Sequence, residues 1–266
     1  MAVRAGLVDE GRVAVSGLGE QIELITPAHN LLNPFSKSVD SLCYMITLIG
    51  GNEFRENCRE MDRALLARLG TSARVLVLPT AAANESPRQA ANNGVQHLKR
   101  LGAKPEPLFV IQREHANSEE GVAAIREAKG VYFTGGDPVH LLETLRGTKV
   151  WQAVVELGER GGLVAGSSAG AMAFGGQTWV PGEGWREGLG LVPKVAVIPH
   201  HATVAARWNA AKMRETLAPE ITLIGIDVAT ALLLPDHLVL GEGEVTVYTP
   251  EPKIYEPGKV IAEKFW

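Results

Sequence analysis

Residues 162–176, GLVAGSSAGAMAFGG, join a short apolar run to a segment of small residues that can begin a helix. Between the two, Gly166-Ser167-Ser168-Ala169-Gly170 fits the pattern Gly-x-Ser-x-Gly, in which a serine occupies a strained turn from strand to helix. The small flanking residues permit the close backbone approach that such a turn requires. The stretch therefore predicts Ser168 as a nucleophile at the carboxyl edge of a sheet. The alternative is that the small residues only let a helix pack tightly on a strand.

The same alternation of apolar runs and helical patterns extends along the chain from residue 45 onward. It is typical of a parallel sheet covered by helices on both faces. After residue 227 the pattern changes to strands joined by tight turns, which predicts an antiparallel edge on the same sheet. The predicted class is therefore α/β, a three-layer, mostly parallel sheet with antiparallel edge strands near the C-terminus. The expected strands are 46–50, 74–79, 107–111, 130–134, 162–166, 195–198 and 221–226, and the expected helices include 57–69, 87–101 and 119–128.

Residues 1–44 lack a clear helix or strand pattern. We therefore expect an N-terminal extension over 1–44, followed by a single α/β domain over 45–266. Two interpretations of the extension stay open. It is either an arm that packs on the domain or a segment that precedes a natural start at Met45.

Composition excludes several classes of protein. The 266 residues are 45% hydrophobic and 21% charged, within the ordinary globular range. A formal net charge of −4 gives no basic field for nucleic acid. Cys43 and Cys58 are too few for a disulfide scaffold, and no apolar run approaches the length of about 18 residues that a membrane span needs. We expect a cytoplasmic protein without nucleic-acid or membrane partners, metal or cofactor.

A second glycine turn, Gly135-Gly136-Asp137, follows the apolar run 130–134. Its backbone N–H groups can face the same sheet edge as Ser168, so Gly136 and Ala169 are the expected donors to a developing oxyanion. The alternative is an ordinary strand-to-helix turn in which Asp137 caps the helix.

Several segments together resemble one family, the serine peptidases that include peptidase E and cyanophycinase. These segments are LIGGNEF (48–54), GVYFTGGDPVHLLETLRGT (130–148), GGLVAGSSAGAMAFGG (161–176), GLGLVPKVAVIPHH (188–201), LIGIDVATALLL (223–234) and LGEGEVTVY (240–248). They follow one another in the family's order from residue 45 to residue 248. The resemblance implies a class I glutamine amidotransferase-like fold and a peptidase that acts through Ser168.

A serine hydroxyl needs a general base, and histidine is the usual one because its pKa lies near neutral pH. The resemblance places this base at His200, and His201 is the alternative. Neighbours at a strand end point to opposite sides, so only one of the two can reach Ser168.

The acid that would orient the histidine is less defined. In cyanophycinase-like members it is a glutamate at the position of Val228, so the adjacent Asp227 is our first candidate. In peptidase E the acid comes from the segment after the nucleophile, where this chain has Glu183 and Glu187.

Substrate recognition is predicted from the same resemblance. Peptidase E selects an N-terminal aspartate, for which Arg207 and Arg214 are candidate partners, although solvated arginines on a helix face would look the same. Cyanophycinase-like members carry a denser arginine cluster here, replaced by ATVAARWNA. A peptidase of small peptides is thus favoured over a cyanophycinase-like hydrolase of aspartyl-arginine polymer or dipeptides. A non-catalytic binding module of the same fold, and a homodimer, are also considered.

Overall fold

Five strands form the parallel part of a seven-stranded sheet in the computed structural model, which describes residues 44–249 and 252–262. The order in the sheet is β11-β10-β1-β5-β4-β2-β3, and β10 and β11 pair antiparallel at the edge next to β1. Apart from Tyr44, the predicted extension 1–44 lies outside the described residues. The strands of this sheet are β1 (Met45–Ile49), β2 (Arg74–Leu78), β3 (Lys104–Pro107), β4 (Gly130–Phe133), β5 (Leu163–Ser167), β10 (Thr230–Leu234) and β11 (Leu238–Gly241).

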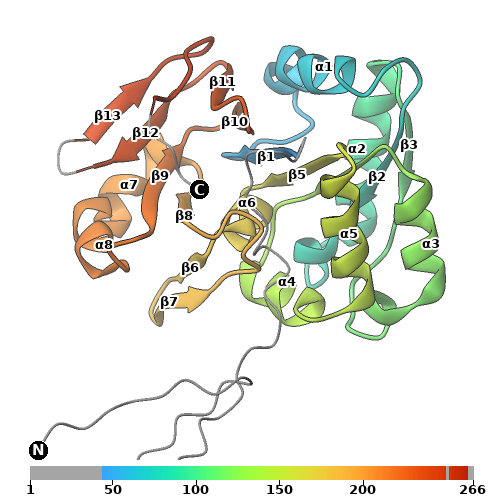
Figure 1. Ribbon diagram of the computed structural model, residues 1–266, viewed down its shortest axis with the longest axis horizontal. Coiled ribbons are helices and arrows are strands. Elements are labelled where there is room, and N and C mark those ends of the chain that lie inside the picture. The colour runs from blue at the N-terminus through green and yellow to red at the C-terminus, as the bar shows by residue number, and fades with distance from the viewer. Residues whose placement is uncertain (1–43, 250–251, 263–266) are drawn as a thin grey trace, which may run out of the picture. The chain divides into compact units, whose positions relative to one another are not determined.

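Helices cover both faces of this sheet, so its inner strands β1, β2, β4 and β5 are buried on both sides (Figure 1). Successive residues of β4 illustrate this: Tyr132 belongs to the core cluster of α1 (Arg59–Ala67) and α2 (Pro87–Arg100), whereas Phe133 packs edge-on against Phe174 of α6 (Ala169–Phe174). The other face also holds α5 (Lys149–Glu159), on which α3 (Glu119–Glu127) packs. The predicted three-layer α/β class is confirmed.

Short elements complete this part of the fold. They are the helix α4 (Pro138–Leu145), the 3-10 helices η2 (Glu56–Cys58), η3 (Thr80–Ala82) and η4 (His115–Asn117), and the hairpin of β6 (Gln177–Val180) and β7 (Gly184–Glu187). No helix in the described ranges is long and apolar enough to span a bilayer.

A second sheet of four strands is formed by segments that follow residue 194, drawn in orange and red in Figure 1, whereas β10 and β11 of the same stretch belong to the main sheet. We expected the runs 195–198 and 221–226 in the main sheet, and this is a correction: β8 (Val195–Ile198) and β9 (Thr222–Ile226) pair with each other and not with the main sheet. The helices α7 (His201–Trp208) and α8 (Ala210–Thr216) pack on this sheet. The other two strands, β12 (Val245–Tyr248) and β13 (Pro252–Tyr255), extend it antiparallel.

The expected strand 107–111 is misplaced by several residues. The strand is β3, Lys104–Pro107, at an exposed edge of the main sheet; Leu108 N–H still donates to Val77 O at 2.9 Å, and residues 109–111 lie outside the strand. Proline lacks a backbone N–H, and an edge strand tolerates this because one side of it has no partner to lose. Pro105 and Pro107 therefore suit the edge, although their composition did not indicate a strand.

The carboxyl ends of three neighbouring strands bring the predicted site residues together. Strand β5 lies between β1 and β4, so Ser168 is flanked by the loop after β1 and by the glycine turn after β4. The backbone N–H of Ser168 donates to Ile49 O at 2.9 Å, which fixes the turn after β5 against β1.

Candidate active site

Ser168 occupies the strained turn that its sequence pattern predicts. Its φ of 49° and ψ of −108° fall in a region that non-glycine residues rarely adopt. The turn is tight because Gly166 lies directly under α6: a Cβ on Gly166 would come within 2.7 Å of the carbonyl carbon of Gly170. The strained backbone places the serine, half-buried, at the start of α6.

His200 supplies the imidazole that faces this serine. Its Nε2 lies 3.0 Å from Ser168 Oγ, and its backbone adopts the left-handed conformation with φ 49° and ψ 38° just before α7. The backbone N–H of His200 donates to Gly50 O at 2.7 Å, and its ring lies over Gly51, where an added Cβ would be 2.3 Å from Cε1. The loop after β1 thus fixes the position of the imidazole next to Ser168.

Burial keeps this imidazole neutral at neutral pH. Loss of solvent lowers the pKa of His200 below its ordinary value, and the negative charge of Glu53 opposes part of that change. A neutral ring can accept the proton of Ser168, which is what a general base must do.

The two expected oxyanion donors come from neighbouring turns, Gly136 from the turn after β4 and Ala169 from the turn after β5. Among the described residues, no acceptor is hydrogen-bonded to the backbone N–H of Gly136 or of Ala169. The glycine turn lies against the nucleophile, because a Cβ on Gly135 would be 3.2 Å from Ser168 Cβ. Asp137 also caps α4, as the alternative interpretation expected, by accepting from the N–H groups of Val139 and His140.

Comparison with known proteins gives the family. The model of Peptidase family S51 matches residues 46–240. The chain belongs to Peptidase family S51. Cyanophycinases are relatives of this S51 chain: that of Nostoc sp. (strain PCC 7120 / SAG 25.82 / UTEX 2576) is 31% identical over 225 residues, which cover 77% of this chain and 73% of the relative. That of Synechococcus elongatus is 25% identical over 229 residues, covering 79% and 70%.

Solved structures agree with this family. A peptidase from an acI-B1 Actinobacterium superposes with a TM-score of 0.75 at 32% identity, covering 83% of this chain and 97% of the other. A putative peptidase E protein from Listeria monocytogenes EGD-e has the same fold, with a TM-score of 0.54 at 18% identity over 80% of this chain and 98% of that one. Members of S51 are serine-type hydrolases, so the chain is an enzyme of that type and not a binding module.

Asp227, the first candidate for the third catalytic residue of this S51 peptidase, lies beside the other histidine. Its Oδ1 is 3.7 Å from His201 Nδ1 and accepts from the backbone N–H of Ala202 at 2.8 Å, and its Oδ2 accepts from the N–H of Glu244 at 3.1 Å. In the described part of the chain, no aspartate or glutamate forms a hydrogen bond or ion pair with the ring of His200. The side chain of Asp227 thus ties the start of α7 to β12 instead of orienting His200.

Within the ranges that the structure describes, the alternative acids and the predicted arginines form no hydrogen bond or ion pair with Ser168 or His200. Glu183 pairs with Arg186, and Glu187 lies 3.1 Å from Arg146, both at exposed positions. Arg207 is exposed on α7, and Arg214 donates from Nε to Tyr248 O at 3.3 Å. The structure therefore brings together Ser168, His200 and the glycine turn, whereas Glu183, Glu187 and Arg214 contact other groups and Arg207 is exposed.

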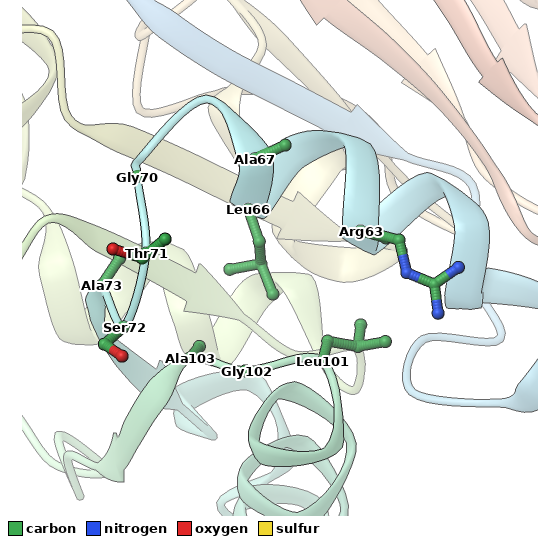
Figure 2. Close-up of a pocket in the computed structure, with 10 residues that line it drawn as sticks. All are labelled: Arg63, Leu66, Ala67, Gly70, Thr71, Ser72, Ala73, Leu101, Gly102 and Ala103. Atoms are coloured by element: carbon green, nitrogen blue, oxygen red, sulfur yellow. The ribbon is translucent and has the colours of Figure 1, made fainter.

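No group of three or more His, Cys, Asp or Glu side chains within residues 44–249 and 252–262 is arranged to hold a metal ion. A pocket of about 460 Å³ lies elsewhere, between the C-terminal ends of α1 and α2 and the turn before β2 (Figure 2). Figure 2 shows Leu66 and Leu101 bordering it, with Thr71 and Ser72 on the turn. The pocket lies at the amino end of β2, whereas α/β folds carry their sites at the carboxyl ends of the strands.

Two residues of the site were missed from the sequence. Gly51 supports the ring of His200, and Glu53 accepts hydrogen bonds from Gly135 and Ser167. The signal was present in the segment LIGGNEF, where a carboxylate follows two glycines at the end of the first strand. Its partners are 82 and 114 positions away in sequence, so spacing could not reveal them.

Proposed function

We propose that this S51 enzyme hydrolyses small peptides, with Ser168 as nucleophile and His200 as general base. The observation that carries the proposal is the 3.0 Å distance between Ser168 Oγ and His200 Nε2. Both residues have a positive φ angle. Strained residues of this kind persist where the surrounding structure holds them, often at catalytic sites.

In the first half of the reaction, Ser168 Oγ attacks the scissile carbonyl carbon and its proton passes to His200 Nε2. The carbonyl oxygen becomes an oxyanion, for which the N–H groups of Gly136 and Ala169 are the proposed donors. His200 then gives its proton to the amide nitrogen, the C–N bond breaks, and the amine leaves. The acyl group stays on Ser168 as an ester.

In the second half, water replaces the amine. His200 accepts a proton from water, the resulting hydroxide attacks the ester carbonyl, and the same two N–H groups hold the second oxyanion. The proton returns to Ser168 Oγ as the ester bond breaks. The products are a carboxylic acid and the free enzyme.

The substrate proposal rests on the family and on the absence from the sequence of the arginine cluster that cyanophycinase-like members carry. Small peptides, with aspartyl dipeptides among them, are favoured because ATVAARWNA lacks the arginine cluster of cyanophycinase-like members. The 31% identity to a cyanophycinase supports one second candidate, aspartyl-arginine polymer or the dipeptides derived from it. We also propose a cytoplasmic location, which the unpaired, buried thiol of Cys58 supports.

A dipeptide library read by mass spectrometry tests the proposal. The library should contain α-aspartyl dipeptides, β-aspartyl-arginine and dipeptides without aspartate, and the aspartyl-arginine polymer should be assayed separately. We expect hydrolysis of small peptides by the wild-type enzyme and none by Ser168→Ala, which removes one oxygen from a turn already built of small residues.

Two outcomes would change the proposal. Cleavage of the polymer with no cleavage of α-aspartyl or neutral dipeptides would select the cyanophycinase-like activity. Hydrolysis by Ser168→Ala at the wild-type rate would reject Ser168 as the nucleophile. Thermal unfolding of both proteins should be compared, because an equal loss of stability and activity would indicate a packing role.

A further inference from the structure

Glu53 connects the two turns on which the proposed chemistry depends. Its Oε1 accepts from the backbone N–H of Gly135 at 2.7 Å, and its Oε2 accepts from Ser167 Oγ at 2.8 Å. Gly135 immediately precedes the proposed oxyanion donor Gly136, and Ser167 immediately precedes the nucleophile. One carboxylate thus bridges the turn after β4 and the turn after β5.

The carboxylate is itself held in place from the core. Phe54, the next residue, has its ring 4.7 Å from that of Tyr132 and 5.9 Å from that of His97, measured between centroids. His97 is fixed in turn by Asp62, whose Oδ2 lies 2.9 Å from Nε2. The buried neighbours of Phe54 therefore determine the position from which Glu53 reaches the two turns.

The glycine turn depends on such a contact because its backbone has few other restraints on this side. On its far side, Asp137 N–H donates to Ala81 O at 2.8 Å, and Gly136 lies so close to this carbonyl that a Cβ would be 2.2 Å from it. On the side of the nucleophile, Gly135 N–H has Glu53 as its acceptor. Removing the carboxylate would free the peptide between Thr134 and Gly135 to rotate, and Gly136 follows that peptide by one residue.

We propose that Glu53 is a positioning residue of this enzyme, which aims the N–H of Gly136 at the oxyanion by holding Gly135 and the serine strand together. The inference rests on the proposed function, because it assigns Gly136 and Ser168 their roles. The negative charge of Glu53 also assists the reaction, because it stabilises the imidazolium form of His200 that arises when His200 accepts the proton. No direct contact between Glu53 and His200 is needed for this.

The test is the rate at which a fluorophosphonate modifies the enzyme. Ser168 Oγ attacks phosphorus, fluoride leaves, and the phosphoryl oxygen occupies the oxyanion site, so no peptide substrate is required. We would measure the rate constant and the final labelled fraction for wild type, Glu53→Ala, Glu53→Gln and the matched control Glu56→Gln. Glu56 is exposed three residues further on and pairs with Arg59.

We expect Glu53→Ala to lower the rate constant by about 10²-fold, the usual cost of losing one oxyanion donor, while the final labelled fraction stays complete. Glu53→Gln keeps an acceptor for Gly135 and should lose less, and Glu56→Gln should match wild type. A variant that is merely misfolded would lower the labelled fraction and leave the rate constant of the folded remainder unchanged.

Wild-type rate constants for both Glu53 variants would overturn the inference while leaving Ser168 as the nucleophile. A lower labelled fraction at an unchanged rate constant would also overturn it, in favour of a structural role for Glu53. If the wild-type enzyme is not labelled at all, the proposed function fails first, and the inference is overturned with it.

Discussion

His200 and His201 are consecutive in sequence, half-buried, and each has its pKa lowered by loss of solvent, yet their surroundings differ. The ring of His200 faces Ser168 and packs against Gly51 in the loop after β1. The ring of His201 faces Asp227, and its Nε2 forms a hydrogen bond with Tyr248 OH at 2.7 Å. The ring of His201 lies so close to β9 that a Cβ on Gly225 would be 2.0 Å from it.

The difference shows that a histidine paired with an acid is not by that fact the catalytic one. The pair of His201 and Asp227 joins α7 to the second sheet, while the histidine that contacts the serine has its position set by backbone. We infer that the two histidines have separate roles, His200 in the chemistry and His201 in anchoring the start of α7.

Removal of each imidazole should separate the two most clearly. His200→Ala should lower kcat by about 10⁶-fold, because nucleophile and base act as a unit. His201→Ala should keep kcat within about tenfold and instead lower the unfolding temperature, since it loses the part-buried hydrogen bond to Tyr248 OH. Steady-state kinetics and thermal unfolding of both variants provide the measurement, and the reverse ranking would exchange the two assignments.

The support beneath His200 can be tested without touching its side chain. Gly51→Ala should lower kcat by about 10²-fold or more, because the new Cβ would displace the ring from Ser168. Gly70→Ala is the matched control, since Gly70 also has positive φ but no atom within 4 Å of an added Cβ. The control should lose about 1–2 kcal/mol of stability from backbone strain and no activity. Equal activities of the two variants would show that the ring position does not depend on Gly51.

Asp227→Asn tests whether the acid beside His201 takes part in catalysis. Loss of an orienting acid costs about 10⁴-fold in kcat in the well-studied triad. Here we expect less than about a tenfold loss of kcat and a loss of about 1–2 kcal/mol in stability, because the amide nitrogen cannot accept from Glu244 N–H. Urea unfolding and kcat should be measured together. A loss near 10⁴-fold at unchanged stability would restore Asp227 as the orienting acid.

The pH profile should show the smallest effect. Burial lowers the pKa of His200, so the acidic limb of kcat/KM should have an apparent pKa below the ordinary value of about 6.5. Glu53 raises that pKa, so Glu53→Gln should move the limb to still lower pH. An acidic limb above pH 7, or a shift to higher pH in Glu53→Gln, would contradict the surroundings described for this histidine.

Local patterns predicted much of this molecule because local chemistry determines it. The strand, turn and helix at 162–176 follow from apolar and small residues alone, and strands buried on both faces, such as β2 and β4, were found within about one residue. The exposed edge strand β3 was misplaced, because Pro105 and Pro107 satisfy the geometry of an edge without an apolar pattern.

Features that depend on the pairing of segments distant in sequence could not be predicted from the sequence. The apolar runs of β8 and β9 resemble those of the main sheet, and only their pairing shows that they form another one. The side to which Asp227 points depends on α7 and β12, which lie before and after it in the chain. In the sequence Glu53 looks like an ordinary loop carboxylate, and only the structure shows that the turns after β4 and β5 lie beside it.

The proposed chemistry depends on Ser168 and His200 as the reacting pair. Fluorophosphonate labelling of wild type, His200→Ala and His201→Ala, followed by peptide mapping, tests it most directly. We expect one adduct on Ser168 in wild type and in His201→Ala, and no adduct in His200→Ala over the same time. An adduct on another residue, or loss of labelling in His201→Ala with labelling intact in His200→Ala, would contradict it.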